Sequence, residues 1–396
     1  MHYTNISASL KIRRFATYPI IAIIVMFNAS CNNPEQTTPS FDAKVGLTES
    51  LRLAMAATET PGALLAWQQG DNPAQIVALG VSNIDLKTPI TSDVHMLIGS
   101  VTKLFTSQLA LLLVQEGKLS PNDKISQYVT GVPRGDEITL RQLANHTSGL
   151  PDAISNPQFQ KAIMGKPDRQ WTARKILAYA FEQESHFPPG EGWRYANTNT
   201  ILLALAAQGV SDQKIDELIS RYILTPYGLD NSGFTMAGAL PEPNSHGYRF
   251  GAQGRPIGYG EVFYDVTEYS PSWSHAAGAM YSTIDDLIAI AKALAQGDLL
   301  NEETRAELHQ YVQTGDSDWQ YAWGIELFGK MVGHRGDVPG YQCCLAYVPS
   351  LDLAIVAMTN LSNDQHARGP ANMLANIIYE YHLQLKNQPI TAKANY

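Results

Sequence analysis

The segment Ser100-Val101-Thr102-Lys103 places a hydroxyl and an amine three positions apart. At the start of a helix, residues i and i+3 share a face, so Lys103 can reach the Ser100 hydroxyl. A serine hydroxyl is a weak nucleophile that needs an adjacent base, and a lysine amine serves as one only when it is neutral. Burial and the positive end of a helix both favour the neutral amine. The spacing therefore predicts a nucleophile with its base, and it places the Ser100 backbone N–H where it can hold an oxyanion.

This four-residue pattern is short enough to arise by chance, and the chain contains it a second time. Ser211-Asp212-Gln213-Lys214 carries the same two groups at the same spacing. There Ser211 follows Gly209 and precedes an amphipathic stretch, which is typical of a residue that caps the start of a helix. We therefore expect Ser100, and not Ser211, to do chemistry.

Two further short motifs carry groups that suit acyl transfer. Tyr195-Ala196-Asn197 offers a phenol that can relay a proton and an amide that can orient a substrate, but a turn with a buried tyrosine gives the same letters. The triplet also occurs at Tyr3-Thr4-Asn5. His334-Arg335-Gly336 is expected on a strand, where Gly336 would let a substrate backbone approach closely. The alternative for His334 is an ordinary surface histidine at a strand end.

The elements that must position these groups follow from the spacing of apolar residues. Apolar side chains recur at helical spacing from Ser100 to about Glu116, and Gly117 then ends the expected helix. Strands are expected before this helix and near the C-terminus, with further helices between and after them. The expected strands are 63–67, 76–81, 323–327, 331–334, 342–348 and 353–359. The other expected helices are 44–57, 140–143, 173–181, 200–208, 214–223, 283–294 and 371–383.

This order of elements predicts a two-lobed α+β fold, in which an antiparallel sheet flanked by helices is interrupted by a mostly helical insertion. We expect a catalytic domain over 44–385, followed by a tail over 386–396. Its sheet lobe would comprise 44–120 and 276–385, and its helical lobe 121–275. A cleft between two lobes is the default position of a site, and Ser100 lies at their expected junction.

The composition excludes several classes of protein. The chain has 396 residues, of which 44% are hydrophobic and 16% charged, so it can bury a sizeable core. Its net charge of −9 argues against a protein that tracks nucleic-acid phosphates. Three cysteines are too few for a disulfide scaffold or a cysteine-rich metal site, and His246 and His275 lack metal-ligand spacing. We expect neither a metal nor a cofactor.

The first 30 residues have the pattern of a signal peptide. A basic cluster at 11–14 precedes an apolar run over 15–27, which is shorter than a membrane span and of normal length for a signal-peptide core. Removing residues 1–30 would leave 25 basic against 37 acidic residues, a net charge of −12. The chain is therefore expected to be exported.

Cys31 follows the small residues Ala29 and Ser30, and this arrangement resembles the lipobox of bacterial lipoproteins. Asn28 is a poor match, because an aliphatic residue is usual there. We expect lipidation of Cys31 and a polar, proline-bearing tether over 31–43, which predicts a periplasmic or cell-surface lipoprotein of a bacterium. Ordinary secretion and an uncleaved anchor are the alternatives.

The order and spacing of the three motifs together are far more specific than any one motif alone. Tyr195 lies 95 residues after Ser100, and His334 lies 139 residues after Tyr195. In this arrangement the chain resembles the serine β-lactamase and penicillin-binding superfamily, whose motifs are S-x-x-K, Y-x-N and K/H-x-G. The similarity is to its branch of class C β-lactamases and D-Ala-D-Ala carboxypeptidases, and it covers about residues 46–382. Further family-like stretches are 138–151, 225–229 and 276–287.

The resemblance implies that Ser100 attacks a substrate carbonyl and forms an acyl-enzyme. Lys103 and Tyr195 would share the work of the general base and then return the proton to the leaving group. Which of these two residues holds the proton at rest stays open, because the two would titrate as a coupled pair.

The resemblance also implies residues that bind the substrate and stabilise charge. Asn197 would hold a substrate amide, while His334 and Gly336 would contact the substrate from a strand. His334 stands where the β-lactamases of this branch carry lysine. The oxyanion hole would use the backbone N–H groups of Ser100 and Asp337, and losing one such donor typically costs ~10²–10³ in rate.

Arg335 and Asp337 depart from the family pattern, which often has small or hydroxyl residues there. On a strand these two residues share one face, opposite His334 and Gly336. They could pair with each other and stay out of the site, or Arg335 could bind a substrate carboxylate. We favour the pairing.

Three other residues are expected to be structural. Cys343 and Cys344 are adjacent on an expected strand, so their side chains point to opposite faces and we expect buried free thiols. His146 lies in a family-like loop and is expected to support the site without reacting.

The sequence thus predicts a serine hydrolase of the D-Ala-D-Ala carboxypeptidase or penicillin-binding type, acting on D-amino-acid peptides or related amides and esters. The histidine of the third motif favours this over a true β-lactamase, although a fold does not fix a substrate. A class C-like β-lactamase or an esterase is the alternative enzyme. An inactive protein that binds cell-wall peptide or β-lactam is the alternative from another class. The expected partners are a small substrate, such as a peptidoglycan stem peptide or a β-lactam, and a membrane reached through the lipid anchor, but no nucleic acid.

Overall fold

The computed structural model describes residues 39–250, 263–362 and 369–387. The predicted signal peptide, Cys31 and most of the predicted tether and tail lie outside these residues, so those predictions stay untested. No helix within the described ranges is both long and apolar enough to span a bilayer.

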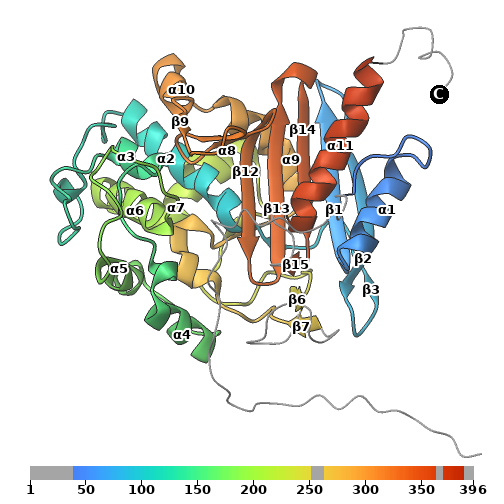
Figure 1. Ribbon diagram of the computed structural model, residues 1–396, viewed down its shortest axis with the longest axis horizontal. Helices are drawn as coiled ribbons and strands as arrows, with labels where there is room; N and C mark the ends of the chain where they lie inside the picture. Colours follow the sequence, from blue (N-terminus) through green and yellow to red (C-terminus); the bar gives the residue numbers. More distant parts are fainter. Residues whose placement is uncertain (1–38, 251–262, 363–368, 388–396) are drawn as a thin grey trace, which may run out of the picture.

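A nine-stranded antiparallel sheet forms the centre of the molecule (Figure 1). Its order is β3-β2-β1-β14-β13-β12-β11-β10-β9, so the first long strand lies beside the last one. The first three strands are β1 (Gly62–Gln69), β2 (Gln75–Asn83) and β3 (Thr88–Pro89). The others are β9 (Val312–Gln313), β10 (Trp319–Tyr321), β11 (Glu326–Phe328), β12 (Met331–Val338), β13 (Tyr341–Val348) and β14 (Leu353–Thr359).

Helices cover both faces of this sheet, because the central strands are apolar on both sides. Helices α1 (Leu47–Ala57) and α11 (Gly369–Asn387) pack together on one face, and α9 (Ile284–Gln296) packs on β13 and β14 from the other (Figure 1). The alternation of a strand is visible at Cys343 and Cys344, which are buried free thiols in the two different cores. Both expectations for this pair are confirmed.

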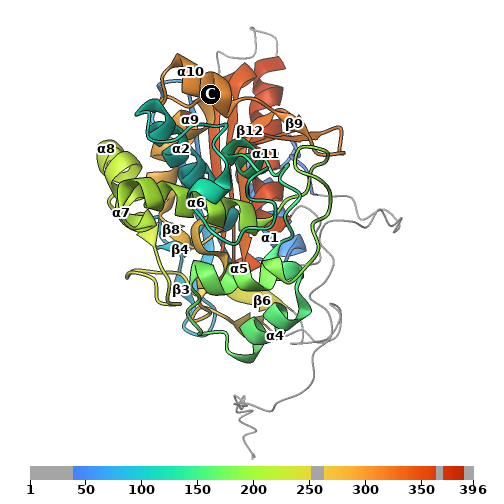
Figure 2. The same cartoon turned by 90° about the vertical axis from the view of Figure 1, so that its left-hand side faces the viewer.

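Most of the remaining helices form a second region beside the sheet, which faces the viewer in Figure 2. Helix α2 (Thr102–Gln115) is almost wholly buried and packs against α6 (Asn197–Ser211). The other helices are α3 (Leu140–Ala144), α4 (Pro157–Gly165), α5 (Ala173–Phe181), α7 (Ile215–Ile219), α8 (Thr225–Tyr227) and α10 (Glu302–Leu308). Two small sheets complete the fold, formed by β4 (Met96–Leu97), β5 (Gly233–Phe234) and β8 (Met280–Ser282), and by β6 (Tyr248–Phe250), β7 (Phe263–Asp265) and β15 (Leu361–Ser362).

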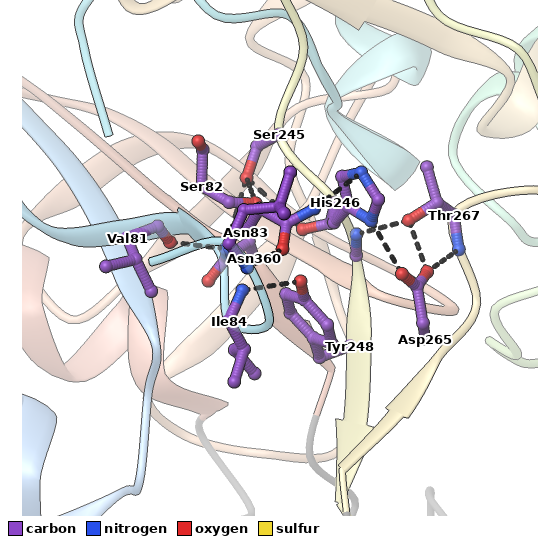
Figure 3. Close-up of polar contacts among 12 residues, drawn as sticks. Val81, Ser82, Asn83, Ile84, Ser245, His246, Tyr248, Asp265, Thr267 and Asn360 are labelled. Carbon is purple, nitrogen blue, oxygen red and sulfur yellow. Dashed lines mark hydrogen bonds and ion pairs between the residues drawn. The ribbon is translucent and has the colours of Figure 1, made fainter. Parts of the chain in front are cut away.

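A polar cluster ties the β2–β3 hairpin to β6 and β7 (Figure 3). The His246 ring donates from Nδ1 to Asp265 Oδ2 at 2.6 Å and contacts Asn83 Nδ2 through Nε2 at 3.0 Å. The Tyr248 hydroxyl accepts the backbone N–H of Ile84 at 2.9 Å. These contacts fix the end of β2 against the small sheet, at one side of the molecule.

The α+β class and the antiparallel sheet are confirmed, while several element boundaries differ from expectation. The predicted strand 323–327 is wrong in its first half. Gly324 has a φ of 62°, and Ala322 N–H donates to Ile325 O at 2.9 Å, so the chain makes a tight turn before β11 begins at Glu326. The predicted capping role of Ser211 is also wrong, because Ser211 is the last residue of α6 and Lys214 precedes α7.

Candidate active site

Ser100 lies at the junction of the sheet and the buried helix α2. It sits in a 3₁₀ turn over Gly99–Val101, and α2 begins two residues after it, slightly later than the sequence indicates. Lys103, in the first turn of α2, donates from Nζ to Ser100 Oγ at 3.0 Å. The i, i+3 contact expected from the sequence is therefore present.

The Lys103 amine is surrounded by three acceptors. Besides Ser100 Oγ, it contacts Asn197 Oδ1 at 2.9 Å and the backbone oxygen of Ala277 at 2.8 Å. Its side chain is fully buried, and Nζ lies 4.7 Å from the centre of the Tyr195 ring. Burial lowers the pKa of Lys103 to about 7, against the opposing pull of the carboxylates of Asp152 and Glu326. Near neutral pH this amine is therefore about half deprotonated.

The Ala277 carbonyl is held by a sharp turn in the backbone. His275 has a φ of 45° and a ψ of −134°, a conformation that costs a non-glycine residue of order 1–3 kcal/mol. Two oxygens follow this turn into the site region: Ala276 O accepts from Thr106 Oγ1 at 2.8 Å, and Ala277 O accepts from Lys103. The strained turn thus positions the two carbonyl oxygens that accept hydrogen bonds from Thr106 and Lys103 of α2.

Asn197 joins the lysine to a buried carboxylate. It is the first residue of α6, where its backbone N–H donates to Asp152 Oδ2 at 2.8 Å and its Nδ2 donates to the same oxygen at 3.1 Å. Asp152 is 8% exposed, and burial raises its pKa. With Oδ1 on Lys103, both ends of the Asn197 amide are already engaged by the protein.

Tyr195 lies two residues before the first residue of α6 and packs among aromatic rings. Its ring centre lies 4.5 Å from that of His146 and 5.9 Å from that of Tyr321. Burial raises the pKa of Tyr195 well above its ordinary value, although a hydrogen bond with Ser100 opposes this. The phenol is therefore neutral at pH 7 and lies within reach of the nucleophile.

His146 packs against the ring of Tyr195. Burial lowers its pKa well below the ordinary range, so the ring is neutral. Its Nδ1 contacts Asn199 Nδ2 at 3.0 Å, and Asn199 Oδ1 accepts from Ser148 Oγ at 2.6 Å. His146 thus packs against the rings of Tyr195 and Tyr321, and its supporting role stays a prediction.

His334 lies on β12 with both ring nitrogens engaged. Nδ1 donates to the carbonyl of Arg335 at 2.6 Å, which leaves Nε2 to accept from the Tyr321 hydroxyl at 2.9 Å. The side chain is 1% exposed, and burial lowers its pKa to about 4. His334 is therefore a neutral, buried neighbour of Tyr195, and direct contact with a substrate remains a prediction.

Arg335 pairs with a different residue from the one expected. It donates from Nε to Glu326 Oε2 at 2.6 Å, across from β12 to β11. Asp337, its expected partner, accepts from Gln342 Nε2 at 2.6 Å. The pairing with Asp337 is thus wrong, because the neighbouring strand supplies a buried carboxylate that the spacing within β12 does not reveal.

Gly99 and Gly336 bring the 3₁₀ turn and β12 into close contact. A Cβ on Gly336 would clash with the Ile98 carbonyl oxygen and would stand 3.1 Å from Ser100 N. A Cβ on Gly99, where φ is 53°, would stand 2.7 Å from Asp337 N. The sequence suggested that Gly336 makes room for a substrate; in the structure it makes room for the chain's own backbone. The backbone N–H groups of Ser100 and Asp337 consequently both lie at this contact between the 3₁₀ turn and β12.

Three neighbours of the site were missed by the sequence analysis. Asp152, Tyr321 and Glu326 are all buried around the motif residues. Glu326 carried a usable signal, since it is a lone charge between apolar residues within the expected strand 323–327, whereas Asp152 lies in a loop without periodicity. Within residues 39–250, 263–362 and 369–387, no group of three or more histidine, cysteine, aspartate or glutamate side chains could hold a metal ion.

Comparison with known proteins agrees with this fold. The sequence model of the Beta-lactamase family matches residues 47–379, so the chain belongs to that family. Penicillin-binding protein 4* of Bacillus subtilis is 25% identical over 309 residues, which cover 72% of this chain. The match covers 65% of that protein, and the match to a putative penicillin-binding protein of the same species covers 64% of it, so the chain spans just under two thirds of these relatives.

Solved structures show the same architecture. A D-stereospecific amidohydrolase from Streptomyces is 26% identical with a TM-score of 0.71, over 80% of this chain and 94% of its own. A D-amino acid amidase from Ochrobactrum anthropi, complexed with L-phenylalanine amide, superposes with a TM-score of 0.75 at 24% identity, over 86% and 99% of the two chains. The protein therefore has the serine β-lactamase fold, is related to penicillin-binding proteins and shares its fold with D-amino acid amidases.

Proposed function

We propose that the protein is a serine hydrolase that forms an acyl-enzyme at Ser100 and cleaves peptide, amide or ester bonds of D-amino-acid derivatives. The observation that carries this proposal is the set of three acceptors around the Lys103 amine. The remaining features of the site agree with it.

The three acceptors favour Lys103 as the general base. A neutral amine has two N–H groups and one lone pair, while Asn197 Oδ1 and Ala277 O can only accept. The ammonium donates to all three oxygens, but in the neutral amine these two oxygens take both N–H groups, so the contact with Ser100 reverses and its hydroxyl donates to the Lys103 lone pair. With a pKa of about 7, the amine can take the Ser100 proton as Oγ attacks a carbonyl carbon.

The neutral phenol of Tyr195 suits the second proton transfer. Because burial holds its pKa well above neutrality, it carries a proton that it can pass to the leaving nitrogen or oxygen and recover from the Lys103 ammonium. The acyl–leaving group bond then breaks, and the acyl group stays on Ser100 Oγ. Water attacks that ester with the same groups acting in reverse, which frees the acid and restores the Ser100 hydroxyl.

The contact between β12 and the 3₁₀ turn suits an oxyanion hole. When Oγ adds to the carbonyl, its oxygen gains negative charge, which backbone N–H donors stabilise best in a fixed site. The amides of Ser100 and Asp337 lie close together there, held by the contact of Gly99 with Gly336. We assign these two donors to the oxyanion.

The substrate class in this proposal rests on the relatives. Penicillin-binding proteins and enzymes named for D-amino acid amides and D-stereospecific amides are similar to this chain over most of its length. The neutral His334, where β-lactamases of the branch carry lysine, sets the site apart from theirs. D-amino-acid amides, peptides and esters are therefore the first substrates to test.

The test combines trapping with turnover. The protein is incubated with a fluorescent penicillin and, separately, with D-phenylalanine amide and a p-nitrophenyl ester of D-phenylalanine. We expect release of ammonia and of p-nitrophenol, together with a Ser100-linked penicillin adduct found by mass spectrometry. Rapid hydrolysis of penicillin would instead indicate a β-lactamase, and cleavage of the ester alone would indicate an esterase.

The chain offers its own matched control. Ser100→Ala should abolish the adduct and both activities, whereas Ser211→Ala removes the serine of the other S-x-x-K sequence and should leave them unchanged. If Ser100→Ala hydrolyses these substrates as fast as the wild type, the proposed mechanism is wrong. If penicillin binds reversibly without an adduct or turnover, the protein is an inactive binding protein.

The proposal includes export and attachment to a membrane through a lipid on Cys31. Its basis is the signal-like segment 1–30 and the small residues before the cysteine. Expression of the full chain in bacteria followed by membrane fractionation tests it. Cys31→Ser should release the protein from the membrane fraction, and unchanged attachment would refute lipidation.

A further inference from the structure

Asp152 is a buried carboxylate to which the proposed reaction gives no part. The residue is 8% exposed and precedes the 3₁₀ turn Ala153–Ser155. Its Oδ1 accepts from the backbone N–H of Ile154 at 3.1 Å, and its Oδ2 accepts from the backbone N–H of Asn197 at 2.8 Å and from Asn197 Nδ2 at 3.1 Å. All three groups are donors, so they stabilise the ionised carboxylate, which can only accept.

The loop that carries Asp152 is fixed against the start of α6 by two further hydrogen bonds. Thr198 Oγ1 donates to the carbonyl oxygen of Pro151 at 2.8 Å, and Asn199 Oδ1 accepts from Ser148 Oγ at 2.6 Å. These four residues are buried. The carboxylate is therefore held in one place relative to the first turn of α6.

The carboxylate also suits the end of the helix, which offers a purely structural explanation for it. Asn197 is the first residue of α6, and the preceding Ala196 makes no capping hydrogen bond through its side chain. Asp152 accepts one of the free N–H groups there, and its negative charge lies at the positive end of the helix dipole. Capping accounts for the backbone contact, but it does not require the second contact, from Asn197 Nδ2.

This second contact decides which way the Asn197 amide points. Because a carboxylate can only accept, the amide nitrogen faces Asp152, and the amide oxygen then faces Lys103, whose Nζ donates to it at 2.9 Å. If the amide turned over, Nδ2 would face the neutral amine and donate to its lone pair. That lone pair would then be lost to the Ser100 hydroxyl.

We propose that Asp152 is a positioning residue, which holds the oxygen of the Asn197 amide toward Lys103. The lone pair of the neutral amine is then kept for the proton of Ser100. The inference rests on the proposed acyl-enzyme function and deepens it. Asp152 acts on the base through Asn197, and its charge acts on the base as well, since it raises the pKa of Lys103.

Two variants separate the charge of Asp152 from its role as an acceptor. Asp152→Asn removes the charge and keeps an oxygen, which the backbone N–H of Asn197 still requires as its acceptor, so the Asn197 amide should keep its orientation. Asp152→Ala removes both the charge and the acceptor. Hydrolysis of D-phenylalanine amide is measured as a function of pH, and kcat is compared on the plateau above the midpoint of each variant, where Lys103 is neutral in all of them.

The two variants should differ in rate and agree in midpoint. On the plateau, Asp152→Ala should lose about tenfold or more in kcat, because a misdirected base forfeits part of the ~10²–10⁴-fold that proton transfer contributes. Asp152→Asn should stay within about threefold of the wild type. Both should move the midpoint of kcat/KM to lower pH by about half a unit or more, since each removes a charge that raises the Lys103 pKa.

The other titratable groups around Lys103 stay in place in these variants. They are Glu326, Tyr195, His146 and His334. Thr198→Val is the matched control, since it removes a hydrogen bond between α6 and the same loop without touching the amide. It should lower the stability to urea and leave both the plateau kcat and the midpoint unchanged.

Either of two results overturns the inference: a folded Asp152→Ala that keeps the wild-type kcat on the plateau, as capping alone predicts, or one that loses no more than Asp152→Asn. If Asp152→Ala does not fold, Asp152→Asn decides. An unshifted midpoint would then mean that the carboxyl is uncharged in the folded protein, and an uncharged carboxyl can donate and does not fix the amide. Failure of the proposed function would look different, because Ser100→Ala would then hydrolyse the amide at the wild-type rate.

Discussion

Replacing Lys103 by methionine should abolish hydrolysis and yet remove a cost to folding. In the unfolded chain this lysine has its ordinary pKa of 10.5, whereas burial lowers the pKa to about 7 in the folded protein. Between these two values the unfolded state binds more protons than the folded state, so the folded protein loses stability as the pH falls from 10.5 toward 7. Below the folded pKa the cost reaches its full size.

The size of this cost follows from the two pKa values. At about 1.4 kcal/mol per pKa unit, keeping Lys103 buried costs about 4 kcal/mol at pH 7 and about 1 kcal/mol at pH 10. Methionine has a similar length and no charge, so it removes the cost. It also leaves Asn197 Oδ1 and Ala277 O without their donor, at about 1–3 kcal/mol each, but this loss does not depend on pH.

Urea unfolding of the wild type and of Lys103→Met at pH 7 and pH 10 measures the difference. The stability of the variant relative to the wild type should be about 3 kcal/mol more favourable at pH 7 than at pH 10. Lys214→Met, which replaces the exposed lysine of the other S-x-x-K sequence, is the control and should show no such dependence. If the stability of Lys103→Met relative to the wild type changes by less than about 1 kcal/mol between the two pH values, the lowered pKa of Lys103 in the folded protein is refuted.

Three further outcomes can be checked. The value of kcat/KM should rise with pH around a midpoint of about 7, and Glu326→Gln should move this midpoint to lower pH, because it removes a charge that raises the Lys103 pKa. Gly336→Ala should lower kcat by ~10²-fold or more in a protein with a wild-type circular dichroism spectrum, since its Cβ pushes β12 away from Ile98 and displaces an oxyanion donor; a rate within threefold of wild type would contradict this. Glu307→Ala should lower the free energy of unfolding by ~2–4 kcal/mol, measured in urea, because it strips a buried carboxylate from its arginine and tryptophan partners. Activity per folded molecule should survive that change.

The sequence was sufficient where the relevant contact is local or where a motif carries it. The pair of Ser100 and Lys103 is set by helical spacing, and the α+β class follows from the order of apolar segments. The strand expected over 323–327 failed because Trp323 is buried in a turn, so an apolar residue there does not signal a strand.

The partners of the charged residues could not be predicted from the sequence, for a different reason. The partner of Arg335 depends on which residue of the adjacent strand lies near it, and that register is a property of the assembled sheet. Asp152 becomes part of the site only in the folded chain, where the start of α6 brings Asn197 into contact with it. The need for glycine at position 336 likewise arises from the 3₁₀ turn, a segment far away in the chain.

The position of β1 in the sheet has a consequence for how the chain folds. Ala63 in β1 is opposite Thr359 in β14, and on its other side β1 pairs with its hairpin partner β2. The interior strand β1 is thus synthesised early, but its partner β14 is almost the last strand to be made. Because such distant pairings must wait for loop closure, refolding should be slow, with the apolar run Gly62-Ala63-Leu64-Leu65-Ala66-Trp67 exposed along an unpaired edge in the meantime. A chain truncated before β13 would lose the neighbours that close the centre of its sheet, and it should aggregate through that edge.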